Sequence, residues 1–198
     1  NFFGFPREKM LKWGYFPAVK RYDDINGLLR EKENASILWV ARLIEWKHPD
    51  ASILVAEKLK KAGYNFKLRI IGSGTLEESL KSLIKEKNLC DCVEMLGAMS
   101  PEKVREYMEK SQIFLFTSDR KEGWGAVVNE AMNGGCAVIA SSAAGSPRFL
   151  IDDGKNGFLY KSGNDKELFC KLKTLLDDKG ATEETGRKAY ETMDTLWN

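Results

Sequence analysis

The feature of this sequence that most constrains its fold is the alternation of short apolar runs with longer amphipathic segments. Buried strands are predicted for the apolar runs at residues 37–41, 66–71, 93–96, 113–117 and 137–141. Helical spacing predicts helices at residues 49–62, 76–87 and 126–133, and another that begins after Ser100, with Pro101 in its first turn. Strands that alternate with helices form a parallel sheet. We therefore predict an α/β fold, a Rossmann-like doubly wound parallel sheet flanked by helices.

The two ends of the chain are less regular than its middle. Residues 1–32 hold aromatic residues and prolines without a clear period, so we predict a segment that packs on the domain without forming a regular layer. The domain itself is predicted to occupy residues 33–198. After Pro147 the weaker pattern predicts a short helix, an edge strand at 157–160, a helix at 165–176 and a helical ending from residue 181.

Composition narrows the classes of function. The chain has 198 residues, 43% of them hydrophobic, and a net charge of +2, which is typical of one soluble domain and gives no reason to expect a nucleic-acid surface. Only Cys90 and Cys92 are close together among the four cysteines, and no histidine adjoins them, so we expect no metal site. No apolar run approaches the ~20 residues of a membrane span, and we expect reduced thiols in a cytoplasm.

The predicted topology brings two loops together. Doubly wound sheets usually order their strands 3-2-1-4-5, so residues 42–48 after the first strand should face residues 118–125 after the fourth. Gly123 and Gly125 precede a helix, whose first amides could then approach a phosphate closely. Arg42 and Lys47 would supply the positive charge that a diphosphate needs. Taken singly, each cation is also what a solvated loop would carry.

Two carboxylates complete the pattern. Seven residues separate Glu122 from Glu130, which falls in the second turn of the predicted helix, so both can face the same crevice. A carboxylate accepts two hydrogen bonds from a vicinal diol. A diphosphate between two polyols fits both features, and a nucleotide sugar is such a ligand. Such a pair can equally be a solvated helix face.

At these residues the chain resembles the family 4 glycosyltransferases of the two-lobed GT-B type, and in particular their C-terminal donor-binding lobe. Residues 122–132 resemble the family's E-x7-E signature, with Trp124 where phenylalanine is usual. The resemblance runs from about Ser36 to Tyr160. Further matches are the GRL-x3-K loop at 41–47, the I-I-G-x-G turn at 70–74, the G-x-P segment at 145–147 and the DG-x-NG-x-L segment at 153–159.

The resemblance implies a role for each matching residue. Arg42 and Lys47 would neutralise the donor diphosphate, and Glu122 would bind hydroxyls of the transferred sugar; these three form the implied catalytic set. The remaining implied donor-binding positions are the ribose ligand Glu130, the sugar-facing amides of Gly123, Trp124 and Gly125, the phosphate-facing amides of Ala126 and Val127, the base-facing Ala98 and Met99, and Gly72.

The resemblance also implies an activity: a hexose is transferred, with retention of configuration, from a UDP- or GDP-sugar to a glycan, a lipid or another hydroxyl acceptor. No Asp-x-Asp motif is present, so we expect no metal cofactor. The acceptor lobe, N-terminal in this class, is expected to be absent from this chain, which should be inactive without it. Peripheral membrane contact of the full-length protein is compatible with the aromatic and basic residues Lys12, Trp13, Tyr15, Phe16 and Lys20.

Some residues depart from the family pattern, and other functions remain open. Ala41 replaces a common glycine, and His48, the single histidine, is expected at the surface or behind the site rather than in catalysis. A sugar-nucleotide epimerase of the same fold and a non-catalytic nucleotide-binding regulatory domain are the alternatives. A dinucleotide-binding Rossmann domain is disfavoured because Glu77 stands where G-x-G-x-x-G needs glycine.

Overall fold

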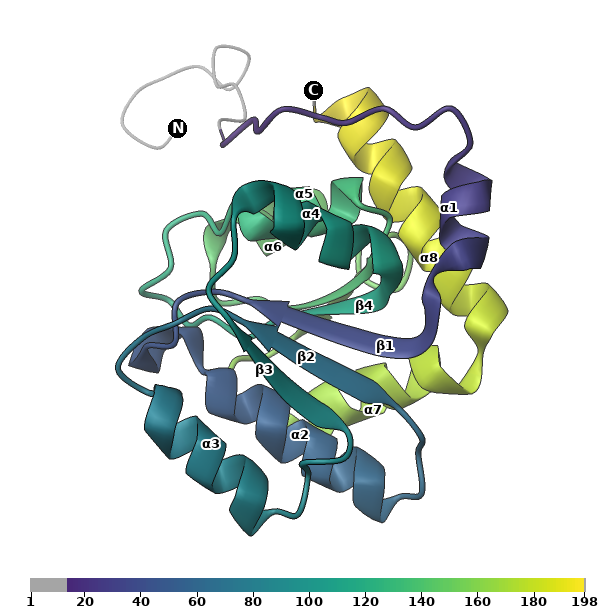
Figure 1. Ribbon diagram of the computed structural model, residues 1–198. Coiled ribbons are helices and arrows are strands. Elements are labelled where there is room, and N and C mark those ends of the chain that lie inside the picture. The colour runs from purple at the N-terminus through teal and green to yellow at the C-terminus, as the bar shows by residue number, and fades with distance from the viewer. Residues whose placement is uncertain (1–13, 198) are drawn as a thin grey trace.

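The computed structural model describes residues 14–197, which form one sheet of six parallel strands with helices on both faces (Figure 1). The strand order is β3-β2-β1-β4-β5-β6. The predicted fold class and the order of the first five strands are therefore confirmed, and β6 is the predicted edge strand. The strands are β1 (Glu33–Val40), β2 (Lys67–Ile71), β3 (Val93–Gly97), β4 (Ser111–Phe116), β5 (Ala137–Ser141) and β6 (Phe158–Tyr160).

The helices divide into two layers. One face of the sheet is covered by α2 (Pro49–Lys61), α3 (Glu77–Glu86) and α7 (Asp165–Asp177). The other face is covered by α4 (Pro101–Lys110), α5 (Val127–Asn133), α6 (Gly145–Leu150) and α8 (Lys179–Glu191). Within residues 14–197, every helix is too short or too polar to cross a bilayer.

Burial on both faces explains why the central strands are continuous apolar runs in the sequence. In β1, Ile37 and Trp39 pack on the α2 side, whereas Leu38 between them packs on the α5 side. The same alternation places Phe114 of β4 in the α5 layer. Side chains of a strand alternate between faces, so a strand covered on both sides needs apolar residues at every position.

Most predicted boundaries lie within two residues of the observed ones, and β5 matches its prediction. The helix after Ser100 begins as predicted, because the Ser100 hydroxyl oxygen accepts a hydrogen bond from the Lys103 amide at 3.4 Å. The sequence predicts a helical ending from residue 181. The structure divides that ending into α8 and a π-helical turn, η3 (Thr192–Leu196).

Residues 1–32 are predicted to pack on the domain without forming a regular layer, and one short helix that the sequence did not predict lies within them. A helix, α1 (Ile25–Glu31), precedes β1, and the Asp24 carboxylate caps it by accepting a hydrogen bond from the Gly27 amide at 2.8 Å. Only Leu29 of this helix is buried, so its sequence carries almost no apolar period. Residues 1–13 lie outside the described part of the chain.

The segment before α1 lies along α5 and α8 (Figure 1). The Asn133 side chain clasps the backbone of Lys20: its oxygen accepts from the Lys20 amide and its nitrogen donates to the Lys20 carbonyl, both at 2.9 Å. The Tyr22 amide donates to the Tyr190 hydroxyl at 3.2 Å. Two side chains thus hold the path of this segment by binding its main chain.

A buried ammonium group joins several of these elements. The Lys32 side chain donates to the carbonyl oxygens of Met108 (2.7 Å), Glu109 (3.0 Å), Ser111 (2.9 Å) and Gly134 (2.8 Å). These carbonyls end α4, begin β4 and follow α5, so one cation ties three elements at the amino edge of the sheet. Burial lowers the pKa of the Lys32 ammonium.

Replacing Lys32 with methionine should lower the free energy of unfolding by about 3–5 kcal/mol, because three buried carbonyls and one part-buried carbonyl lose their shared donor. Urea denaturation followed by circular dichroism measures the change. The matched control is Lys61→Met, which removes a lysine whose side chain is 72% exposed and should change stability by about 0.5 kcal/mol or less. Equal stability of the two variants would contradict a stabilising role of the Lys32 hydrogen bonds.

Candidate functional site

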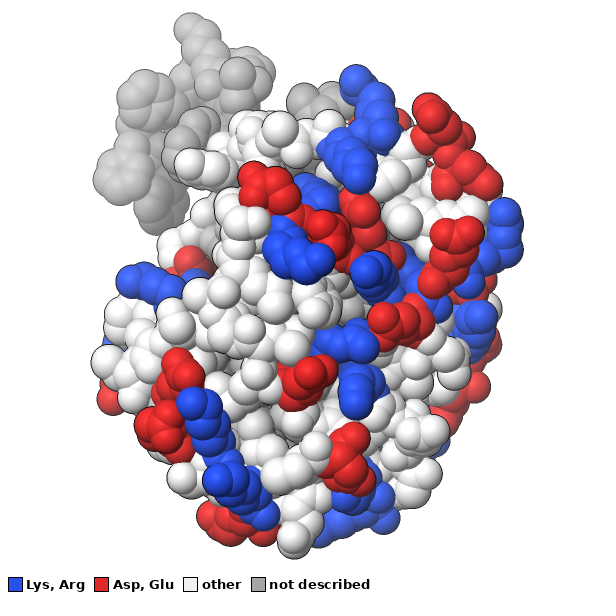
Figure 2. Space-filling view, in the orientation of Figure 1, with Lys and Arg blue, Asp and Glu red and all other residues white. Residues whose placement is uncertain are grey.

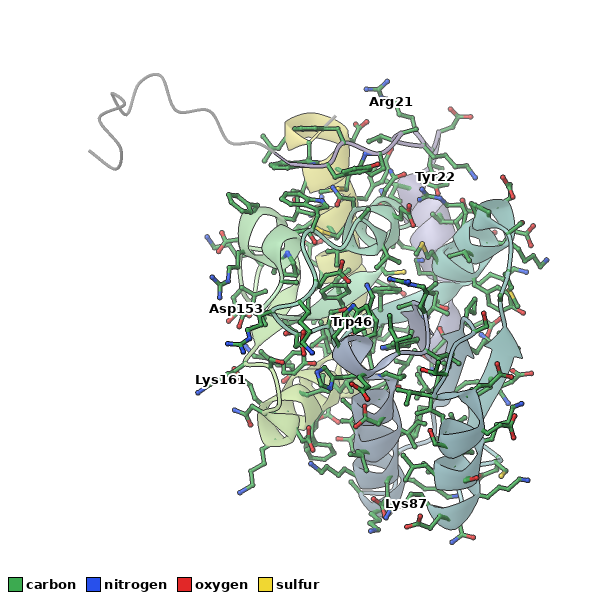
Figure 3. The ribbon with its side chains drawn as sticks, turned by 90° about the vertical axis from the view of Figure 1, so that its left-hand side faces the viewer. Arg21, Tyr22, Trp46, Lys87, Asp153 and Lys161 are labelled. Carbon is green, nitrogen blue, oxygen red and sulfur yellow. The ribbon has the colours of Figure 1, made fainter. Side chains whose placement is uncertain are left out.

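The carboxyl ends of β1 and β4 adjoin, because Leu38 pairs with Phe114 and Trp39 with Leu115 across the two strands. The loops that follow are joined by hydrogen bonds. The Trp39 indole donates to the Thr117 hydroxyl at 2.8 Å, and this hydroxyl donates to the Lys47 carbonyl at 2.5 Å. The two loops meet, as the strand order predicts, and Figure 3 faces this edge with Trp46 near its centre.

Where the loops meet, the Lys47 ammonium forms an ion pair with the Glu122 carboxylate. The two side chains are only 14% and 15% exposed, and the Ser118 hydroxyl donates to the same carboxylate oxygen at 3.4 Å. Burial lowers the pKa of the Lys47 ammonium, and the nearby Arg42 guanidinium lowers it further. The structure therefore brings the three residues of the implied catalytic set into one neighbourhood.

Arg42 is the exposed member of this set. Its guanidinium carbon lies 5.8 Å from the centroid of the Trp46 ring, so the aromatic face supports the cation without occupying its N–H groups. Within residues 14–197, no carboxylate forms an ion pair with it. A guanidinium fork is thus available to an anion beside the buried Lys47–Glu122 pair.

The turn of residues 123–125 is held against α6 by its carbonyl groups. The Gly145 amide donates to the Gly123 carbonyl at 3.2 Å, the Ser146 amide to the Trp124 carbonyl at 2.9 Å, and the Ser146 hydroxyl to the Gly125 carbonyl at 3.1 Å. In a trans peptide the N–H points opposite to the carbonyl. The amides of residues 124–126 consequently point away from α6.

Two glycines make this arrangement possible. Gly125 has φ +84°, and a Cβ atom there would lie 2.6 Å from the Phe116 ring. A Cβ atom on Gly145 would lie 2.5 Å from the Gly123 carbonyl oxygen, so only glycine lets α6 approach the turn. The helix itself begins at Val127, one residue later than predicted, with Ala126 as its cap residue.

Glu130 lies in the first turn of α5 rather than the second, because the helix starts later than predicted. Burial raises the pKa of its carboxyl group, and the Arg105 guanidinium opposes that shift. Arg105 also donates to the Glu130 carbonyl at 3.0 Å and to the Asn133 side chain at 3.1 Å. No hydrogen bond or ion pair within the described chain links Glu130 to Glu122, so the placement of both carboxylates in one crevice stays a prediction.

The remaining candidates, Gly72, Ala98 and Met99, also lie at the carboxyl edge, on the β2 and β3 side. Gly72 has φ +147°, and a Cβ atom there would come within 1.9 Å of the Ala41 carbonyl oxygen. Close contact between strand ends therefore requires this glycine, whether or not a ligand binds. Ala98 is exposed, and Met99 is half-buried beside the second core cluster.

Sequence reasoning missed three polar neighbours of the site, namely Ser118, Arg105 and Asp119. The Asp119 carboxylate lies 3.1 Å from the His48 ring, at the start of α2, and the Asp119 amide donates to the Trp46 carbonyl at 2.9 Å. Arg105 is 25 residues away from its partner Glu130, and Asp119 is 71 residues away from its partner His48. A local sequence pattern therefore cannot predict these contacts. His48 contacts the loop after β4, consistent with a place behind the site.

Cysteines and acidic residues do not converge on a metal in the described chain. Within residues 14–197, no group of three or more His, Cys, Asp or Glu side chains could hold an ion. All four cysteines are free thiols, Cys90 and Cys170 exposed and Cys92 and Cys136 buried.

The fold and its charged carboxyl edge define a Rossmann-like lobe of the GT-B type, and comparison with known proteins gives the family. The family model described as "Glycosyl transferases group 1" matches residues 21–192, so the chain belongs to this family. The amylovoran biosynthesis glycosyltransferase AmsK of Erwinia amylovora is 36% identical over 167 residues, which are 82% of this chain. The chain spans only 41% of that relative's length.

Solved structures agree on the fold. The C-terminal domain of the glycosyl transferase group 1 family protein LpcC from Francisella tularensis has a TM-score of 0.76 at 22% identity, over 92% of this chain and 95% of that one. TarM of S. aureus, in a mutant complex that contains UDP, has a TM-score of 0.79 at 24% identity, over 93% of this chain and 35% of that one. The chain thus has the fold of a C-terminal GT-B lobe.

Gly125→Ala should destabilise the protein by about 1–2 kcal/mol from its left-handed backbone, and by about 1–3 kcal/mol more from the collision with Phe116. Gly154→Ala is the matched control, because Gly154 also has a left-handed φ of +79° but open space around its Cβ position. Thermal and urea unfolding of both variants measure the difference. If Gly154→Ala costs as much as Gly125→Ala, close packing of the turn is not the reason for glycine.

Proposed function

We propose that this chain is the donor-binding lobe of a retaining family 4 glycosyltransferase, which transfers a hexose from a UDP- or GDP-sugar to a glycan, lipid or other hydroxyl acceptor. The observation that carries the proposal is the Arg42 guanidinium, which has no carboxylate partner within residues 14–197. It lies beside the buried Lys47–Glu122 pair and near a turn whose amides point away from α6. Membership of the glycosyl transferase group 1 family supports it.

The charges suit the bond that has to break. Cleavage of a sugar–phosphate bond develops negative charge on the departing diphosphate, and fixed cations stabilise that state more than the ground state. Arg42 would grip the diphosphate as a planar fork and Lys47 as a compact charge. As Lys47 turns to phosphate, Glu122 is released to accept hydrogen bonds from hydroxyls of the transferred sugar.

The rest of the donor would extend along the carboxyl edge. The amides of residues 123–125 would meet the sugar, and those of Ala126 and Val127 the distal phosphate. Glu130 would bind the ribose diol. Ala98 and Met99, at the end of β3, would lie near the base, and Gly72 would allow the donor to pass close to the backbone.

Acceptor recognition belongs, in this proposal, to a second lobe, which the single-sheet domain of residues 14–197 does not supply. The chain alone should therefore bind donor but transfer nothing, because half of the cleft that excludes water is absent. We propose that the two cations replace a metal ion in balancing the diphosphate. The family match and the glycosyltransferase relatives favour neither an epimerase nor a regulatory domain.

We also propose a cytoplasmic setting, with peripheral membrane contact of the full-length protein. Tyr15 and Phe16 are 60% and 54% exposed, as such contact requires. Lys20 is bound to Glu109, so it is less free to meet lipid. Lys12 and Trp13 lie outside the described residues. On the face drawn in Figure 2, blue Lys and Arg side chains lie next to red Asp and Glu side chains, with uncharged surface between these groups.

Isothermal titration with UDP and with GDP tests the donor site. Wild-type protein should release or absorb heat with at least one nucleotide, and Arg42→Met should weaken that binding about tenfold to a hundredfold, as expected for a lost charge-assisted hydrogen bond. Lys47→Met should weaken it at least as much, since it also leaves Glu122 unpaired. Arg42→Lys should be intermediate, because it keeps charge without the fork.

Lys61→Met, at the far end of α2, is the control and should bind as wild type. The proposed donor site is contradicted if wild-type protein gives no heat of binding with either UDP or GDP. Measurable sugar transfer by the isolated chain would instead contradict the dependence on a second lobe.

A further inference from the structure

Four aromatic rings form a continuous stack beside the proposed donor site. Phe16 stacks on Trp197 with ring centroids 5.0 Å apart and an interplanar angle of 13°. Trp197 stacks on Trp124 at 5.7 Å and 16°, and Trp124 stacks on Phe149 of α6 at 5.7 Å and 28°. The stack therefore joins the start of the described chain, its end, α6 and the turn of residues 123–125.

Hydrogen bonds hold the two indoles in place. The Trp197 indole donates to the Tyr15 carbonyl at 2.9 Å, although these residues are 182 positions apart in the sequence. The Trp124 indole donates to the Asn129 side chain at 3.0 Å, and that side chain donates to the same Tyr15 carbonyl at 3.4 Å. Because a Cβ atom on Gly14 would lie 2.4 Å from the Trp124 ring, the backbone contacts the indole directly.

The turn needs such support from outside. Trp124 lies between Gly123 and Gly125, and glycine places few limits on the backbone. Gly123 is exposed, and apart from its two chain neighbours no atom of residues 14–197 lies within 4 Å of its Cβ position, so tertiary packing does not hold the turn there. The α6 hydrogen bonds on the carbonyl side, the Trp124–Asn129 hydrogen bond and the ring stack on Trp124 all act on this turn.

We propose that Trp197 and Phe16 are positioning residues of the donor site. They hold the Trp124 indole, and through it the amides of residues 124–126 and the adjoining Glu122, in the orientation that binds donor. This inference rests on the proposed function, because it names what orients the same turn. The two rings act through Trp124.

A positioning role of Trp197 and Phe16 differs from a purely stabilising role in its effect on nucleotide affinity. A residue that only adds stability changes the folded fraction and leaves the nucleotide dissociation constant of folded protein unchanged. A positioning residue changes that constant at temperatures where the variant is fully folded. Lys32→Met is the comparison, since it lowers stability at the amino edge of the sheet, away from the turn.

The experiment uses Trp197→Leu, Trp197→Phe and Phe16→Leu in the complete chain, titrated with UDP and GDP well below the unfolding temperature of each variant. Trp197→Leu should weaken nucleotide binding about tenfold, which is the order expected from two lost aromatic pairs. Trp197→Phe keeps a ring in the stack and should restore affinity to near that of wild type. Phe16→Leu should fall between them.

Tyr15→Leu is the matched control. It removes a neighbouring ring that is 60% exposed and takes no part in the stack, while the Tyr15 carbonyl that binds Trp197 remains. Affinity should be unchanged. Lys32→Met should likewise bind as wild type while it unfolds at a lower temperature.

Far-ultraviolet circular dichroism reports the Trp124–Trp197 contact independently of any ligand, because two close indoles with non-parallel transition dipoles produce an exciton couplet. Wild-type protein should show the couplet, and both Trp197 variants should lose it. A folded Trp197→Leu variant with wild-type affinity would overturn the positioning role. If Trp197→Leu does not fold, wild-type affinity of the Phe16→Leu variant would overturn that role instead. A couplet without any nucleotide binding would mean that the proposed function has failed, and the inference with it.

Discussion

The pairing of β1 with β4 is the constraint on which the rest of this structure depends. These strands are 70 to 80 residues apart in the chain, yet they are hydrogen-bonded neighbours, so the loops after them begin side by side. The Trp39 indole and the Thr117 hydroxyl extend that contact beyond the ends of the strands to the Lys47 carbonyl. Arg42, Lys47 and Glu122 lie on these two loops, whereas Glu130 and its neighbour Arg105 lie on α5 and α4.

The site combines a buried ion pair, Lys47–Glu122, with a surface cation, Arg42, that has no carboxylate partner within residues 14–197. Lys47 and Glu122 are both largely buried and balance each other, which avoids the large cost of burying either alone. Arg42 lies at the surface against Trp46, and in the part of the chain that the structure describes no carboxylate pairs with it. A ligand with negative charge on one part and hydroxyl groups on another could engage all three residues. A neutral surface loop would not need this arrangement.

Much of the architecture was predictable because its signals are local. Apolar runs and helical spacing placed five strands and most helices, and glycines marked the ends of several of them. The prediction failed at α1, where seven residues bury only Leu29 and so display no period. It was one residue early at α5, because Ala126 is a strong helix former but stands outside the helix as its cap.

The sequence by itself determined the α/β class, the strand order through the usual topology of such sheets, and the motif that led to the glycosyl transferase group 1 family. Only the tertiary structure decided that Lys47 pairs with Glu122. It also decided that Arg105 donates a hydrogen bond to the Glu130 carbonyl and that Trp197 stacks on Trp124. The physical reason is distance along the chain. Periodicity and capping act over a few residues, whereas these contacts join segments that become neighbours only after the sheet has formed.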